Sequence, residues 1–229
     1  MDTNVKILIA IPNIDGPKAE FSSSLANYWG RQKYPSNITY INDTYIPIAR
    51  NTAVAIATDM KATHLMFIDS DMSFPAQGID ALVERDKDII GGLYFGRKTP
   101  LPVALDVDPE LGTMRFLPKV PRWDEPFKVP VVGTGFMLIK MDVFNKIPRP
   151  HFLQGDITEF GVKQAPYPKD QVGEDVFFCL KANKYGIDVW CDPTIPLGHV
   201  GRKIYTKRDY ELYTTADEKT KEIYGNFLW

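Results

Sequence analysis

The chain has 229 residues, of which 27 are Lys or Arg and 29 are Asp or Glu, so its formal net charge at pH 7 is −2. Both charge signs are mixed along the chain, which argues against non-specific nucleic-acid binding but leaves room for a small local basic patch. The length suits one large α/β domain, and no Pro/Gly/Ser-rich linker divides it. We therefore predict a single domain spanning residues 1–229.

Membrane and export signals are missing from the sequence pattern. No stretch approaches the roughly 20 apolar residues that span a bilayer. The apolar run at 5–11 is too short, and has the wrong flanks, for a signal peptide. Cys179 and Cys191 have no metal-knuckle spacing and are expected to be small buried hydrophobic residues in a reducing compartment. We expect a soluble cytoplasmic protein.

The first hundred residues alternate between two patterns. Short continuous apolar runs predict buried strands, and apolar residues at helical spacing, introduced by prolines, predict helices. The predicted strands are 5–11, 37–41, 65–68 and 88–95, and the predicted helices begin at Pro17, Pro47 and Pro75. This order is typical of a parallel sheet with right-handed crossovers. The predicted fold class is α/β, with a central, mostly parallel sheet flanked by helices.

The second half of the chain departs from this alternation. Short segments broken by Pro, Asp and Gly at 101–122 predict a small antiparallel excursion, and 129–140 predicts a strand interrupted by glycines. The segment 148–172 is rich in Pro and Gly, and a loop of this length predicts a functional lid or a disordered stretch, of which we favour the lid. The remaining predicted elements are a helix at 174–184, a strand at 187–191 and a closing helix near 217–224.

Two carboxylates, Asp69 and Asp71, follow the predicted strand 65–68 directly. In an extended segment residues i and i+2 point the same way, so both would face one site while Ser70 faces elsewhere. A cation or a hydrogen-bonding ligand would offset their repulsion. A hard cation such as Mn²⁺ or Mg²⁺ completes its shell with phosphate oxygens and water, which suits a nucleotide diphosphate. A solvated turn is the plainer alternative, but the position at the end of a strand favours a ligand site.

Six short motifs together resemble a GT-A-fold glycosyltransferase of the small, family 2-like type. They are Ile9-Ala10-Ile11-Pro12, Ala49-Arg50-Asn51, Phe67-Ile68-Asp69-Ser70-Asp71 (the DxD motif), Gly133-Thr134-Gly135-Phe136, Gly173-Glu174-Asp175-Val176 and Gly198-His199-Val200-Gly201. The resemblance covers about 5–201 and weakens at 101–122 and 148–172. It implies a GT-A (Rossmann-like) sheet, with a nucleotide-binding half at about 1–100, an acceptor-binding half at about 101–201 and a basic tail at 202–229.

The resemblance also implies a role for each motif. Asp71 and His199 would ligate Mn²⁺ or Mg²⁺, while Asp69 would lie near the ribose and reach the metal directly or through water. Asp175 would accept the proton of the acceptor hydroxyl, and Glu174 would orient the acceptor. The residues implied to bind substrate are Pro12, Asp43, Arg50, Asn51, Asp69, Ser70, Gly133, Thr134, Gly135 and Lys203.

Several of these residues have a structural alternative. Glu174 and Asp175 would stabilise the start of any helix through its macrodipole. Arg50 would pair with the diphosphate or brace Asp69, or would simply be an exposed surface arginine. Lys203 would cover the departing diphosphate or belong to a solvated basic tail.

The predicted function is a metal-dependent glycosyltransferase that moves a sugar from a UDP- or GDP-sugar to an acceptor hydroxyl, with inversion favoured over retention. The acceptor is left open among a saccharide, a lipid head group, a protein and a modified nucleobase, and so is the oligomeric state. A sugar nucleotidyltransferase is an alternative, although residues 12–16 lack the Gly-rich basic loop that cradles a triphosphate. A non-catalytic glycan- or nucleotide-binding module is another. The joint presence of Asp69, Asp71, Glu174, Asp175 and His199 argues against that module.

Overall fold

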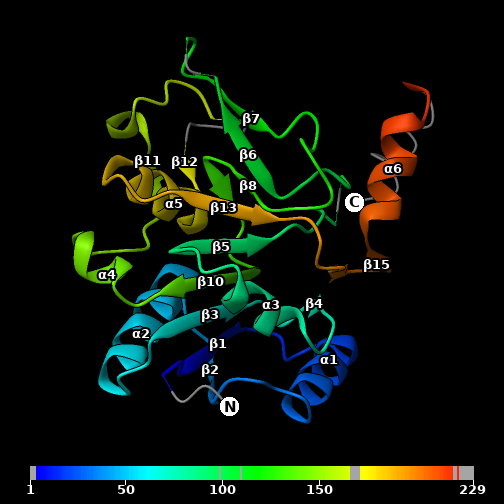
Figure 1. Ribbon diagram of the computed structural model, residues 1–229. Helices are drawn as coiled ribbons and strands as arrows, with labels where there is room; N and C mark the ends of the chain where they lie inside the picture. The colour runs from blue at the N-terminus through cyan, green and yellow to red at the C-terminus, as the bar shows by residue number, and fades with distance from the viewer. Residues whose placement is uncertain (1–3, 98, 109, 166–170, 219–220, 222–229) are drawn as a thin grey trace.

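The computed structural model describes residues 4–97, 99–108, 110–165, 171–218 and 221. A seven-stranded sheet of order β2-β1-β3-β10-β5-β13-β8 runs through its centre (Figure 1). The strands are β1 (Ile7–Asn13), β2 (Ser36–Asn42), β3 (His64–Ile68), β5 (Ile89–Gly92), β8 (Phe127–Lys128), β10 (Phe136–Lys140) and β13 (Val189–Asp192). All share one direction except β10 and β8, which are antiparallel to their neighbours.

Helices cover both faces of this sheet. Successive side chains of a strand point to opposite faces, so Ile7 and Ile9 of β1 enter one core while Leu8 and Ala10 enter the other. The first core lies under α1 (Ala19–Trp29) and α3 (Gly78–Glu84). The second lies under α2 (Ile46–Asp59), α4 (Val143–Lys146) and α5 (Glu174–Lys184). The predicted α/β class, with a mostly parallel sheet flanked by helices, is confirmed.

Smaller antiparallel sheets surround the central one. The predicted excursion at 101–122 is confirmed as a three-stranded sheet of β7 (Met114–Phe116), β6 (Ala104–Val107) and β9 (Val131–Val132). A second one joins β15 (Ile204–Tyr205), β14 (Gly198–Val200) and β4 (Met72–Ser73). The predicted strand 129–140 is therefore two strands, β9 and β10, which belong to different sheets and are separated at 133–135.

The described part of the predicted lid packs into the core instead. The elements of this region are β11 (Gly155–Asp156), the 3₁₀ helix η1 (Thr158–Phe160) and β12 (Gln171–Val172). Phe152, Ile157 and Val162 are at most 2% exposed, and the Phe152 ring stacks on Phe178 with centroids 4.5 Å apart. The lid prediction was wrong for residues 148–165, because these apolar side chains are buried without any regular spacing; residues 166–170 lie outside the described part.

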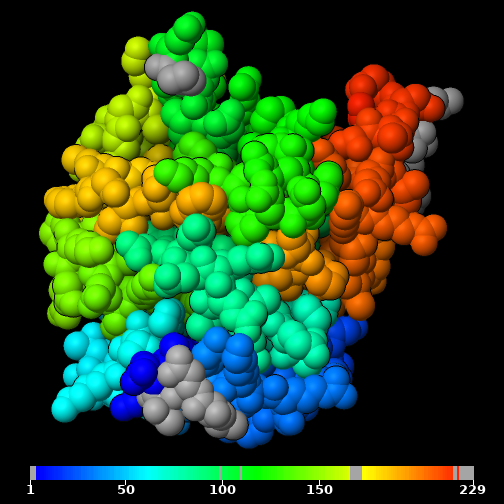
Figure 2. Space-filling model, viewed as in Figure 1, coloured from blue at the N-terminus to red at the C-terminus, as the bar shows by residue number. Residues whose placement is uncertain are grey.

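Helix α6 (Lys207–Thr215) follows the central sheet and was not predicted. The predicted closing helix near 217–224 falls mostly outside the described residues, and Glu218 and Lys221, which are described, are helical. Thr206 and Asp209 form a reciprocal capping box that starts α6. Tyr210 stacks on Phe95 with centroids 5.4 Å apart, which fixes the helix, coloured orange in Figure 2, against the rest of the chain.

Two sequence expectations concern single features of the chain. Cys179 in α5 and Cys191 in β13 are buried free thiols, as expected. Among the described residues, no helix combines the length and the apolar character needed to cross a membrane.

Candidate functional site

A cavity of about 400 Å³ lies where β1 and β3 end and where α2 and α5 begin. The ends of parallel strands are the usual ligand position in sheets of this kind. The predicted site residues that line this cavity are Pro12, Arg50, Asp69, Ser70, Asp71, Thr134, Glu174 and Asp175. Segments separated by more than a hundred residues therefore contribute carboxylates to one space.

Arg50 lies under the cavity as a buried cation between two carboxylates. Its Nη2 donates to Oδ1 of Asp69 at 3.0 Å, and its Nε donates to Oε1 of Glu174 at 2.8 Å. The side chain is only 3% exposed, which excludes the surface-arginine alternative. Burial alone would lower the pKa of Arg50, but the two carboxylates raise it above its ordinary value. Among the described residues, its buried Nη1 has no hydrogen-bond partner.

Asp175 is a carboxyl group that titrates near neutral pH. Burial, followed by the neighbouring charge of Glu174, raises its pKa to about 6. The backbone N–H of Val176 donates to its Oδ1 at 2.8 Å and holds the carboxyl at the start of α5. A carboxylate with this pKa can accept a proton at physiological pH better than an ordinary aspartate.

Asp71 has different partners from Asp69. Its Oδ2 lies 2.8 Å from Nη1 of Arg97 and 3.5 Å from Nε2 of His199. Burial opposes the negative charge, but His199 and Arg97 together hold the pKa of Asp71 below its ordinary value. Asp71 is therefore ionised at neutral pH, and it faces two groups of positive or potentially positive character.

The pair Asp71 and His199 fits a divalent cation. Nδ1 of His199 lies 2.9 Å from the carbonyl oxygen of Phe95, and because a carbonyl only accepts, Nδ1 carries the proton. Nε2 is then left for either a second proton or a metal, the arrangement that metal-ligating histidines usually have. Two donors 3.5 Å apart can both reach one ion at about 2.1 Å.

The protein alone supplies few metal ligands. No group of three or more His, Cys, Asp or Glu side chains that could hold a metal occurs in the described part of the chain. Asp69, the third predicted ligand, is paired with Arg50. A cation such as Mg²⁺ commonly takes one or two protein ligands and completes its shell with phosphate oxygens and water. The residues therefore fit a cation that binds together with a phosphate-bearing ligand.

The glycines of the 133–135 segment make room for a tyrosine that sequence reasoning missed. The backbone N–H of Gly135 donates to the Tyr94 hydroxyl at 3.2 Å, and Tyr94 lines the cavity. A Cβ at Gly135 would lie 2.8 Å from that hydroxyl oxygen, and one at Gly133 would also clash with it. Burial raises the pKa of Tyr94 well above its ordinary value, so the hydroxyl stays protonated. The glycine pair indicated a close approach, but not which residue approaches.

The predicted substrate-binding residues that do not line the cavity are five: Asp43, Asn51, Gly133, Gly135 and Lys203. Both ends of the Asn51 amide are used by backbone groups, with Nδ2 donating to Phe152 O at 2.7 Å and Oδ1 accepting from His151 N at 3.1 Å. Asp43 lies in the left-handed region (φ 53°) just after β2. Lys203 pairs with Asp209 on the surface at 2.5 Å.

Other residues that line the cavity carried no recognisable sequence signal. Lys18 follows the turn after β1, and Arg97 follows β5 in an irregular loop. Neither lies in a periodic pattern or a motif, so their position in this cavity depends on tertiary structure. Both are cationic, and they add positive charge to a cavity whose acidic side chains would otherwise repel an anionic ligand.

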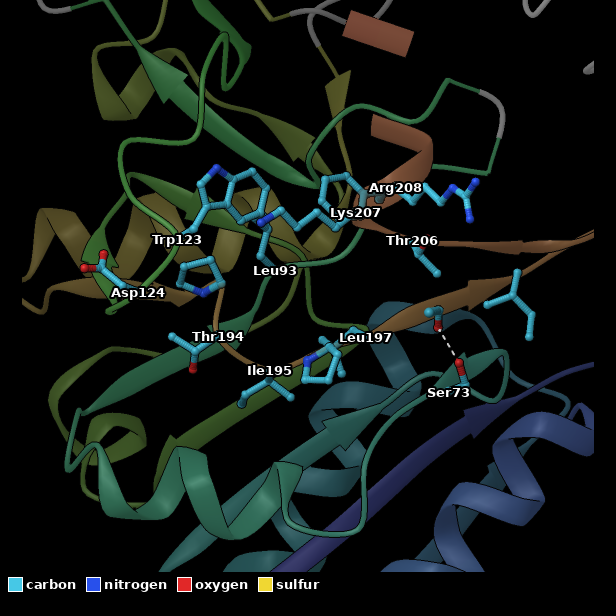
Figure 3. A pocket seen from close by; sticks show the side chains of 15 residues that line it. Ser73, Leu93, Trp123, Asp124, Thr194, Ile195, Leu197, Thr206, Lys207 and Arg208 are labelled. Atoms are coloured by element: carbon cyan, nitrogen blue, oxygen red, sulfur yellow. Dashed lines mark hydrogen bonds between the residues drawn. The ribbon is translucent and has the colours of Figure 1, made fainter. Parts of the chain in front are cut away.

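A larger cavity, of about 600 Å³, lies elsewhere and has a different character (Figure 3). Leu93, Ile195 and Leu197 form much of its surface, and Lys207 lies over the Trp123 ring at 3.9 Å. Its hydroxyls already have partners: that of Ser73 donates to Gly198 O at 3.4 Å, for example. The clustered carboxylates and the buried donor of Arg50 identify the smaller cavity as the better candidate.

Comparison with known proteins supports the fold. The sequence matches no family model and no curated protein. The crystal structure of A197 from STIV superposes with a TM-score of 0.60 at 18% identity, covering 88% of this chain and 94% of that one. HddC from Yersinia pseudotuberculosis (TM-score 0.45, 11% identity, 90% and 96% coverage) and the inositol-1-phosphate CTP transferase from T. maritima (0.45, 9%, 96% and 95%) are more distant. The likeness to A197 shows a shared fold, and the other two are too weak to support an argument.

Proposed function

We propose that this chain is a metal-dependent, GT-A-type glycosyltransferase that moves a sugar from a UDP- or GDP-sugar to an acceptor hydroxyl with inversion. The observation that carries the proposal is that one cavity is lined both by Asp71, whose Oδ2 lies 3.5 Å from His199 Nε2, and by Asp175, a carboxyl whose pKa is raised to about 6. A cation that is held by two protein ligands can also bind a diphosphate, and a base of this pKa can activate a hydroxyl.

Donor binding is assigned to the Asp71 side of the cavity. Asp71 and His199 would hold Mn²⁺ or Mg²⁺, which when bound would neutralise charge on the departing diphosphate. Arg97 and Lys18 would add positive charge near the same phosphates. Arg50 would keep Glu174 and Asp69 in place through its Nε and Nη2.

The transfer itself is assigned to Asp175. Its carboxylate would take the proton of the acceptor hydroxyl as that oxygen attacks the anomeric carbon. The bond from that carbon to the diphosphate oxygen breaks, and the diphosphate leaves with the electron pair. Glu174 is held by Arg50 Nε at 2.8 Å, so it serves better as an orienting group than as the base. A single displacement of this kind inverts the anomeric configuration.

The experiment that tests this function is donor hydrolysis by the Asp71→Ala variant. A panel of UDP- and GDP-sugars is incubated with Mn²⁺, and release of the nucleoside diphosphate is measured. We expect wild type to release it and Asp71→Ala to lose about 100-fold or more of that activity, because the diphosphate loses its cation. Asp59→Ala, at the exposed end of α2, is the control and should keep wild-type activity. Full Mn²⁺-dependent activity in Asp71→Ala would overturn the metal assignment.

A second assay distinguishes the nucleotidyltransferase alternative. Such an enzyme would take a nucleoside triphosphate and a sugar phosphate and release pyrophosphate. The loop after β1, residues 13–18, contains one basic side chain, Lys18, which is a poor cradle for a triphosphate. Pyrophosphate release from triphosphate and sugar phosphate, without hydrolysis of any nucleotide sugar, would favour this alternative.

A further inference from the structure

Arg97 contacts the carboxylate oxygen of Asp71 that would also bind the proposed cation. Its Nη1 lies 2.8 Å from Oδ2 of Asp71, and that oxygen is also the one 3.5 Å from Nε2 of His199. A divalent ion bound by Asp71 and His199 would therefore lie beside the guanidinium, and the two positive charges would repel each other. When no further anion is bound, Arg97 and a metal ion would therefore compete for Asp71.

The position of Arg97 is supported by the turn after β14. A Cβ at Gly201 would lie 3.2 Å from Cδ of Arg97, so the arginine stem runs directly over this glycine. The Arg97 side chain is nevertheless 49% exposed, whereas Arg50 is 3% exposed and held by two carboxylates. Arg50 is thus fixed in the site, while Arg97 has room to leave Asp71 by rotating its side chain.

We infer that Arg97 is the resident counter-ion of Asp71, which opposes the binding of metal alone and moves to the donor diphosphate when metal and nucleotide bind together. This inference rests on the proposed function and concerns the regulation of the same site. A diphosphate brings two or more negative charges, so it can accept both the cation and the displaced guanidinium. Arg97 would thereby make metal and nucleotide binding mutually dependent, and the coupling must be reciprocal.

Mn²⁺ binding tests this inference without any need for turnover. Free Mn²⁺ is measured by electron paramagnetic resonance in titrations of wild type and Arg97→Gln, first without nucleotide and then with saturating UDP or GDP. Without nucleotide we expect Arg97→Gln to bind Mn²⁺ about three- to fivefold more tightly than wild type, because a partly exposed ion pair no longer competes. With nucleotide we expect the order to reverse, because the variant lacks a cation for the diphosphate.

Two further variants identify the source of the effect. Lys18→Gln removes a positive charge from the same cavity, and we expect less than a twofold change in Mn²⁺ affinity without nucleotide. Addition of Asp71→Asn to Arg97→Gln should abolish the gain in affinity. Unchanged or weaker Mn²⁺ binding by Arg97→Gln would overturn the role of Arg97, and so would an equal gain in Lys18→Gln. Mn²⁺ binding that is insensitive to Asp71→Asn in every background would overturn the proposed metal site as well.

Discussion

The carboxyl of Asp175 is held in a crowded electrostatic environment. Its neighbours Glu174 and Asp69 disfavour its ionised form, and the nearby Arg50 favours it. Burial is the largest influence and acts in the same direction as the two carboxylates. The environment that makes Asp175 a useful base near neutral pH therefore also destabilises the folded protein when Asp175 is ionised.

The stability of Asp175→Asn relative to wild type should depend on pH. The carboxyl has a pKa of about 3.9 in an unfolded chain and about 6 in the folded protein. A raised pKa in the folded state means that wild-type stability falls as the pH rises from about 4 to about 6. By urea unfolding, we expect Asp175→Asn to be about 1–3 kcal/mol more stable than wild type at pH 8 and nearly equal to it near pH 4. Asp59→Asn is the control, and a difference that is the same at both pH values would contradict the expectation.

At the residue scale, sequence patterns predict which side chains line a common cavity better than they predict which side chains form ion pairs. Asp69 and Asp71 both line the cavity, as their spacing at the end of a strand predicts. Asp69 pairs with Arg50, whereas Asp71 pairs with Arg97. The second pair was not predictable from sequence, because Arg97 lies in an irregular loop. The roles of these residues in binding and catalysis stay predictions.

At the element scale, apolar spacing predicts regular structure and fails for buried irregular structure. The helix predicted at 174–184 coincides with α5, because a continuous pattern and acidic first-turn residues mark it. The segment 148–165 has no such pattern, yet it packs into the core through isolated side chains such as Phe152. A tertiary hydrogen-bond network between Asn51 and this segment helps to explain why it packs there.

Removal of the Asn51 amide should destabilise the segment that it holds. Asn51 bridges α2 to the backbone of His151 and Phe152, so Asn51→Ala leaves buried backbone groups without partners. We expect a loss of about 1–3 kcal/mol in the free energy of unfolding, measured with urea. The exposed Asn27→Ala in α1 should change it by no more than about 0.5 kcal/mol.

The same variant distinguishes a structural from a ligand-binding role for Asn51. If the amide acts on the 151–152 backbone alone, folded Asn51→Ala should bind the donor as wild type does. A selective loss of donor affinity with unchanged stability would instead support the donor contact that the sequence resemblance implies.

At the scale of the whole molecule, the class of the sheet was predictable, but the antiparallel directions of β10 and β8 were not. The strand–helix alternation of the first hundred residues predicts parallel neighbours, and β2, β1 and β3 follow this rule. Strand β10 enters antiparallel between β3 and β5, and no local pattern marks that direction. The single-domain organisation and its division into halves stay predictions, although the cavity draws residues from both sides of residue 100.

Ligand binding at such a shared cavity should raise the stability of the folded protein. A thermal-shift panel of UDP- and GDP-sugars, with and without Mn²⁺, measures this directly. At a ligand concentration of about 100 times Kd the gain is about 2.7 kcal/mol, or roughly 5–10 °C in Tm for a chain of this size. We expect the shift only when sugar nucleotide and Mn²⁺ are both present, and its loss in Asp71→Ala. A panel in which no nucleotide changes Tm would contradict nucleotide binding.

The pairing of β14 with β4 sets which side chains of β14 share a face with the Asp71 side chain. His199 pairs with Met72, and the backbone N–H of Val200 donates to Asp71 O at 2.7 Å. Alternate residues of a strand face opposite ways, so a shift of this pairing by one position would point His199 away from Asp71 and present Gly198 or Val200 in its place. Neither of those side chains can bind a cation. An insertion that alters the register of the hairpin ending in β15 should therefore remove the imidazole from the Asp71 side of the candidate site.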